Sequence, residues 1–143
     1  MKVCGVELTG SDVVVCLLTL EHGQFTLPAC RVRKLGLNRA YSRQEFQQCQ
    51  REFSKLMKDY SIDTVFIKER MTKGRFAGGA ISFKLEAAVQ LIDHLDVILL
   101  APKTIKTTLS DRPIPILFAE TGLKAFQEAA FTVAYAGLIS RAQ

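Results

Sequence analysis

Two apolar runs at the start of the chain, separated by a turn, limit the possible folds more than any other pattern. Residues 3–8 and 13–19 are mostly apolar, and the segment 9–12 between them has the glycine, serine and aspartate of a turn. They predict an antiparallel hairpin. Residues 24–32 predict a third strand, in which Pro28 is suited to an edge or a bulge. A Rossmann domain begins differently, so this opening argues against one.

An amphipathic helix is predicted after these strands. Ser42 and Glu45 have the spacing of a capping box, which marks a helix start. Apolar residues then recur at steps of three and four on one helical face. These residues are Phe46, Cys49, Phe53, Leu56, Met57 and Tyr60.

The second half of the chain alternates strands and helices. A strand over 64–67, a helix from about residue 80 and a strand over 97–100 predict a parallel pair joined by a crossover. A short helix over 102–109 and a final helix follow. The apolar stripe of the final helix comprises Phe126, Ala130, Val133, Ala134, Gly137 and Leu138. The order βββαβαβα predicts an α/β fold with a mixed five-stranded sheet and helices packed on its faces.

Length and composition indicate one globular unit. The 143 residues suit a single domain over 1–143, and 48% hydrophobic residues supply enough apolar surface to fold. No apolar run is long enough for a membrane span and no signal peptide is apparent, so we expect no membrane association and a cytoplasmic location. The four cysteines lack metal-ligand spacing and are expected to pack in the core.

Positive charge is concentrated in two segments. The net charge is +5, yet residues 31–58 carry eight basic residues against two acidic ones, and residues 68–84 carry five against one. Such clustering is typical of a protein that binds a polyanion, with nucleic acid as the first candidate. The alternative is a solvated basic surface that keeps the protein soluble.

Three glutamates stand where the predicted elements could bring them together. Glu7 interrupts an apolar strand, Glu69 follows the fourth strand, and Glu128 lies at the start of the last helix. Convergent carboxylates are what Mg²⁺ or Mn²⁺ requires, and two such ions can cleave a phosphodiester. Each acid also has a simpler interpretation: solvent exposure for Glu7, pairing with a neighbouring base for Glu69, and a favourable helix-terminal charge for Glu128.

The segments around these acids resemble the ribonuclease H-like superfamily, and within it the RuvC Holliday-junction resolvases and their YqgF-like relatives. Residues 2–11 look like the first strand and turn of RuvC, and 65–69 are similar to its fourth strand with the terminal glutamate. Residues 80–85 look like the helix that follows. Residues 102–106 resemble the lysine-bearing segment near the scissile phosphate, and 128–134 resemble the start of the last helix.

The resemblance implies a ribonuclease H-like fold and a metal-dependent endonuclease, a hydrolase acting on structured DNA or RNA, including branched forms. Glu7, Glu69 and Glu128 would be the catalytic residues and would bind Mg²⁺ or Mn²⁺. A homodimer is expected because resolvases act on two-fold junctions.

Basic residues would hold the nucleic acid. By the same resemblance, Lys103 and Lys106 would contact the phosphate near the cut. Lys73, Arg75 and the stretch 31–43 would add sequence-independent affinity for the backbone.

Two departures from the RuvC pattern favour an alternative function. Glu7 stands where the family has aspartate, and Ala125 stands where RuvC has a second helix acid. The alternative is a non-catalytic nucleic-acid-binding or scaffold module of the same fold with a degenerate metal site. A third hypothesis, an ATPase of the actin-type fold, is disfavoured because that fold needs two such domains.

Overall fold

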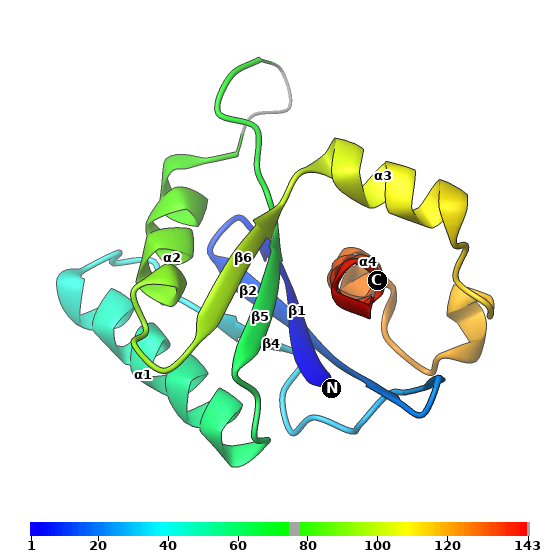
Figure 1. The fold of residues 1–143 in the computed structure, drawn as a ribbon. Helices are drawn as coiled ribbons and strands as arrows, with labels where there is room; N and C mark the ends of the chain where they lie inside the picture. The colour runs from blue at the N-terminus through cyan, green and yellow to red at the C-terminus, as the bar shows by residue number, and fades with distance from the viewer. Residues whose placement is uncertain (75–77, 143) are drawn as a thin grey trace.

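A mixed β-sheet separates two groups of helices in the computed structural model, which describes residues 1–74 and 78–142 (Figure 1). The strands run in the order β3-β2-β1-β5-β6, and β4 pairs with β2. Helices α1 (Arg43–Asp59) and α2 (Ala80–Gln90) cover one face, and α4 (Glu128–Ala142) covers the other (Figure 1). The predicted α/β fold with a mixed sheet is confirmed.

The predicted hairpin is formed by β1 (Lys2–Thr9) and β2 (Asp12–Glu21), which pair antiparallel from Lys2–Thr19 to Thr9–Asp12. The predicted third strand over 24–32 is too long. Strand β3 (Gln24–Thr26) ends before Pro28, which has no N–H to donate to a ladder. The chain pairs with β2 again at β4 (Lys34–Gly36), so the described part of the sheet has six strands rather than five.

The parallel half of the sheet follows the predicted crossovers. Strand β5 (Thr64–Lys68) pairs parallel with β1, and β6 (Asp96–Leu100) pairs parallel with β5. The carboxyl ends of β1, β5 and β6 therefore lie at one edge of the sheet. Residues 69–74 and helix α3 (Pro102–Asp111) follow β5 and β6 directly at this edge (Figure 1).

The α1/α2 face is packed with large apolar side chains. The predicted capping box of α1 is confirmed, because the Ser42 hydroxyl accepts from the Glu45 N–H and the Glu45 carboxylate accepts from the Ser42 N–H. Phe53, Leu56 and Met57 of α1 are buried against β1 and β5, together with Leu85 of α2. A helix start and its apolar stripe thus act together to fix α1 on the sheet.

On the other face, α4 approaches the sheet most closely at small residues. A Cβ added at Gly5 of β1 would overlap the carbonyl oxygen of Ala130 and lie 2.7 Å from the Ala134 Cβ. Gly137 likewise lies directly against the Phe66 ring of β5. Helix α3 packs on the other side of α4, which explains why α4 is buried over most of its circumference (Figure 1).

The middle of the outer edge of β2 is covered without a further strand. Strand β3 pairs with Thr19–Glu21 and β4 with Asp12–Val14, which leaves the segment 15–18 between them. The loop 27–33 runs along this segment, and the Val15 N–H donates to the Arg33 carbonyl at 3.0 Å. A loop that contains Pro28 therefore closes the gap between two short strands.

The cysteines pack in the core as expected. All four are free thiols, and Cys4, Cys16 and Cys49 are buried. Burial raises the pKa of Cys16 to about 12 and that of Cys49 to about 11, so both stay protonated at neutral pH. Within the described residues, no helix has the length and apolar character needed to cross a membrane.

Candidate functional site

Glu7 lies near the carboxyl end of β1, on the face that α4 covers. Its neighbours on alternate positions, Val3 and Gly5, contact α4, and side chains alternate between the faces of a strand. Val14, directly opposite Glu7 on β2, belongs to the same α4-side core. Glu7 is half-buried. Its carboxylate is therefore held at the rim of the α4 core, as the predicted site requires.

Glu69 lies on the other side of the sheet from Glu7. Its N–H donates to the Leu100 carbonyl at 2.9 Å, so the β5 ladder continues to this residue. Phe66 faces α4, so alternation directs Lys68 to the α4 face and Glu69 toward α2. Because Val6 pairs with Ile67, Lys68 is the β5 residue next to Glu7. The register thus puts a cation, rather than the predicted acid, beside Glu7.

Glu128 is exposed in the first turn of α4. The turn before it, the 3₁₀ helix η2 (Ala125–Gln127), is held to the sheet by Gln127, which is 5% exposed. The Gln127 Nε2 donates to the Val15 carbonyl of β2 at 3.0 Å, and its Oε1 accepts from the Lys124 N–H at 3.0 Å. The start of α4 is therefore fixed above the strand next to Glu7.

The carboxylates present do not fit a preformed metal centre. Across residues 1–74 and 78–142, no three His, Cys, Asp or Glu side chains are grouped so that they could hold an ion. Glu7 and Glu128 share the α4 side, and Glu69 faces away from them toward α2. A two-metal site needs several acids around one point.

Glu86 of α2 is an acid near Glu69 that the sequence reasoning missed. Burial raises its pKa, the charge of Glu69 raises it further, and Arg70 acts in the opposite direction. Its Oε2 atom is buried and has no hydrogen-bond partner within the described structure. Glu86 lies one turn after Ser82, a buried residue of the same helix. The four-residue spacing from Ser82 places Glu86 toward the buried side of α2, and this was the sequence signal that could have identified it.

Three of the predicted phosphate-binding residues lie near the carboxyl edge of the sheet. Lys73 is exposed in the segment after β5, and Lys103 and Lys106 are exposed on α3, which follows β6. Arg75 lies outside the described residues. The stretch 31–43 is partly engaged elsewhere, because Arg31 pairs with Asp59 at 2.8 Å.

Phe126 does not belong to the buried stripe of the last helix, contrary to the prediction. It lies in η2, and 44% of it is exposed. The Lys34 Nζ lies 5.4 Å from the centroid of its ring. The prediction failed because a 3₁₀ turn precedes α4, so the phase of the α-helical stripe does not extend back to Phe126.

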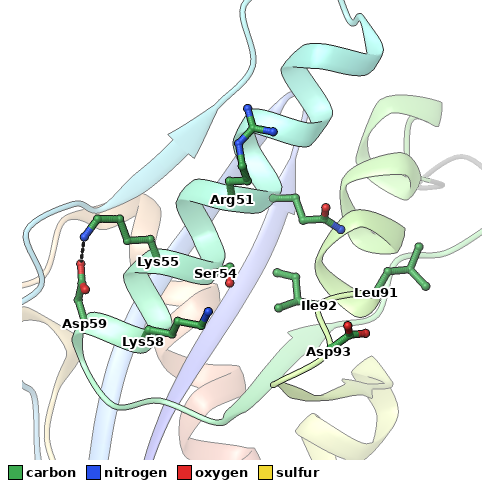
Figure 2. A pocket seen from close by; sticks show the side chains of 9 residues that line it. Arg51, Ser54, Lys55, Lys58, Asp59, Leu91, Ile92 and Asp93 are labelled. Carbon is green, nitrogen blue, oxygen red and sulfur yellow. Dashed lines mark hydrogen bonds and ion pairs between the residues drawn. The ribbon is translucent and has the colours of Figure 1, made fainter.

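A groove of about 490 Å³ lies between α1 and the turn after α2. Figure 2 shows Arg51, Lys55 and Lys58 of α1 on one side and the segment Leu91 to Asp93 on the other. Lys55 pairs with Asp59 at 2.9 Å, and the hydrogen bond from Lys55 keeps the pKa of Asp59 below its ordinary value. The groove lies toward the amino ends of β5 and β6, opposite the predicted site.

Three solved structures share this fold over nearly the whole chain. Thermus thermophilus RuvC is 10% identical with a TM-score of 0.77, covering 99% of this chain and 96% of that chain. T. thermophilus RuvC in complex with a Holliday junction substrate is 12% identical with a TM-score of 0.76, covering 99% and 95%. The fowlpox virus resolvase in complex with substrate Holliday junction DNA is 11% identical with a TM-score of 0.58, covering 100% of both chains.

These likenesses show that the chain has a RuvC-like ribonuclease H fold, as the sequence resemblance predicted. No curated protein matches the sequence. A protein-family model described as "Protein of unknown function (DUF3010)" matches residues 1–137. Since this match spans almost the entire length, the chain belongs to the DUF3010 family.

Proposed function

We propose that this protein binds structured, branched nucleic acid through the carboxyl edge of its sheet. The observation that carries the proposal is the likeness of the fold to RuvC, including the RuvC structure with a Holliday junction substrate, over 99% of this chain. The fold alone does not assign a ligand. The positions of the exposed cations on this scaffold support the assignment.

The cations lie on segments that leave the same edge of the sheet. Lys73 follows β5, and Lys103 and Lys106 follow β6, which is the parallel neighbour of β5. Lys103 is also in the first turn of α3, where unpaired backbone N–H groups favour a phosphate. These side chains would contact phosphates and carry no sequence preference of their own.

The arrangement of acids favours binding without cleavage. A nuclease of the RuvC type would use Glu7, Glu69 and Glu128 with Mg²⁺ or Mn²⁺, yet Lys68 is the neighbour of Glu7 and Glu69 faces α2. The nuclease remains a second candidate because Glu7 and Glu128 both lie on the α4 side of the sheet. Both candidates share the nucleic-acid surface, and they differ in whether these acids bind a metal.

A salt titration of binding tests the nucleic-acid surface. Fluorescence anisotropy with a labelled four-way DNA junction is expected to show saturable binding that weakens steeply with salt. The double variant Lys103→Gln/Lys106→Gln is expected to reduce the slope of log K against log salt by about 2, because each lost phosphate contact removes about 1. The same titration with a structured RNA of similar length distinguishes DNA from RNA.

The groove in Figure 2 provides the matched control. Arg51→Gln/Lys58→Gln removes the same charge from exposed positions at the other end of the sheet. This variant is expected to retain the wild-type slope. If both variants reduce the slope of log K against log salt equally, general electrostatic attraction explains the binding and the proposed surface does not. If the wild-type protein does not bind the junction, the proposal is overturned.

Manganese titration and a cleavage assay separate the two candidates. Calorimetry is expected to detect no saturable Mn²⁺ site in the free protein, and the labelled junction is expected to remain intact in Mg²⁺ or Mn²⁺. Saturable Mn²⁺ binding that is lost in both Glu7→Gln and Glu69→Gln, together with junction cleavage, would establish the nuclease. Light scattering of the free and bound protein tests the expected homodimer.

A further inference from the structure

The surface beside Glu7 presents an aromatic ring with a cation above it. Phe126 is 44% exposed, and the Lys34 ammonium lies 5.4 Å from its ring centroid. Lys34 also lies 3.8 Å from the Asp12 carboxylate, which limits where the ammonium can be. Among the exposed large hydrophobic side chains of the described residues, Phe126 is the one whose aromatic ring has an ammonium group placed over it. Packing within the described fold does not account for the exposed part of this ring.

Strand register connects this ring to the predicted site. Glu7 of β1 is opposite Val14 of β2, and Val14 is opposite Lys34 of β4. The three residues form a row across neighbouring strands, which places the backbones of Glu7 and Lys34 about 10 Å apart at the usual strand spacing. All three lie on the α4 side of the sheet, because Val14 belongs to the α4 core and Lys34 reaches Phe126 of the turn before α4.

The ring is carried on a rigid support. Gln127, the next residue, is 5% exposed and donates to the Val15 carbonyl at 3.0 Å. Its side-chain oxygen accepts from the Lys124 N–H, and its own N–H donates to the Lys124 carbonyl at 2.9 Å. The single turn of η2 is thus held by hydrogen bonds between Lys124 and Gln127 and is attached to β2 through Gln127. Phe126 is held in a defined position at little entropic cost on binding.

An exposed ring flanked by ammonium groups suits a nucleobase next to its phosphates. Bases stack on aromatic side chains in single-stranded nucleic-acid sites, and neighbouring cations track the backbone. Lys34 over the ring and the exposed Lys124, two residues before Phe126 in the chain, provide that charge. A base inside an intact duplex cannot reach a side-chain ring without leaving its stack. The chemistry therefore selects nucleic acid with an unpaired or unstacked base.

We propose that Phe126, with Lys34, forms a stacking platform for an unpaired base, so that the protein prefers single-stranded segments and branch points over intact duplex. This inference rests on the proposed function and specifies the substrate class of the same surface. In this arrangement the base contacts the Phe126 ring and its flanking phosphates contact Lys34 and Lys124. The platform would hold a strand discontinuity beside Glu7.

The chain contains no tryptophan, which allows a direct optical test. Phe126→Trp introduces a single indole at the platform, and stacking with a base is expected to quench its fluorescence saturably. The titrants are a single-stranded oligothymidine, a four-way junction and a blunt duplex of equal length, with quenching expected for the first two only. Leu91→Trp, at a position that is 73% exposed near the groove of Figure 2, is the matched control and is expected to remain unquenched.

Binding constants give a second, independent measure. Phe126→Ala is expected to weaken binding of the single strand by roughly 5- to 150-fold with an unchanged salt slope, since stacking carries no counterion term. Phe126→Leu keeps apolar bulk without the ring and is expected to show a comparable loss, whereas Phe126→Tyr retains binding. Lys34→Gln is expected to reduce the salt slope by about 1. Thermal melts of all variants check that folding is preserved.

The outcomes separate this inference from the proposed function. Wild-type affinity in Phe126→Ala and an unquenched Phe126→Trp, with the junction still bound, would overturn the platform alone. Quenching by duplex equal to that by the single strand would overturn the preference for unpaired bases. If the wild-type protein binds none of the three nucleic acids, the proposed function fails, and the platform fails with it.

Discussion

On one face of the sheet, α1 and α2 pack through long side chains such as Phe53 and Leu85, whereas on the other α4 packs through Gly5, Ala130 and Gly137. The first face is fixed by filled volume. The second also buries large side chains such as Phe131 and Leu138, but it is set in addition by close approach of backbones at the glycines. A helix in backbone contact with a strand cannot slide without collision. The residues around its start, including Phe126 and Glu128, are therefore held in a set position relative to Glu7.

The largest expected effect comes from adding volume on the α4 face. Gly5→Val would drive its side chain into the Ala130 carbonyl, which cannot rotate away. We expect destabilisation above about 4 kcal/mol, in the range reserved for severe core disruption. Chemical denaturation monitored by circular dichroism measures it.

Gly79 is the control for that substitution. A Cβ added there meets nothing within 4 Å, and the residue is the N-cap of α2, where serine is favoured. Gly79→Ser is expected to change the free energy of unfolding by no more than about 0.5 kcal/mol. Equal effects at Gly5 and Gly79 would contradict the account of close packing under α4.

Removing volume from the α1/α2 face is the next largest effect. Phe53 of α1 is fully buried, so Phe53→Ala is expected to cost about 3–5 kcal/mol through lost burial and a cavity. Urea denaturation measures the loss. Phe53→Leu, which keeps most of the volume, should cost markedly less, and a similar cost for both would mean that this face is not fixed by volume.

Gln127 tests how the start of α4 is attached. Gln127→Ala leaves the Val15 carbonyl without its side-chain donor, and we expect a loss of about 1–3 kcal/mol. Amide hydrogen exchange is expected to increase first in η2 and the first turn of α4. Increased exchange confined to α1 and α2 would show that Gln127 does not position α4.

The smallest expected loss of stability among the disruptive substitutions concerns the start of α1. Ser42→Ala removes the acceptor of the capping box and is expected to cost about 1 kcal/mol, whereas Ser42→Asp retains the cap and should be close to neutral. Thermal melting measures both. If Ser42→Ala lowers the stability more than Gln127→Ala does, the cap of α1 contributes more than the attachment of α4 through Gln127, contrary to our expectation.

The pattern of the sequence predicted the fold better than the site. Long periodic segments such as α1, with a capping box and an apolar stripe, carry redundant signals that agree with one another. Strand β4 has only three residues, which is too short for an alternating pattern to be recognised. It was therefore missed, and the strand predicted over 24–32 ends at Thr26 instead.

Glu69 shows why the site was harder to predict. Consecutive residues of a strand point to opposite faces, so a shift by one position exchanges Lys68 and Glu69 beside Glu7. The sequence contains both residues and does not state which one faces α4. Only the pairing of β5 with β1 decides it. Phe126 was misplaced for a related reason, because a 3₁₀ turn changes the phase of the helix that follows.

The loop that covers the middle of β2 also bears on the behaviour of the protein at high concentration. A ten-residue edge strand with free N–H and C=O groups would invite strand addition from another copy and growth into aggregates. Here β3 and β4 pair with the two ends of that edge, and the loop with Pro28 lies along the segment between them, where the Val15 N–H donates to Arg33. The end of β3 before Pro28, which prevents a long regular third strand, thereby limits strand addition along this edge and the self-association that would follow from it.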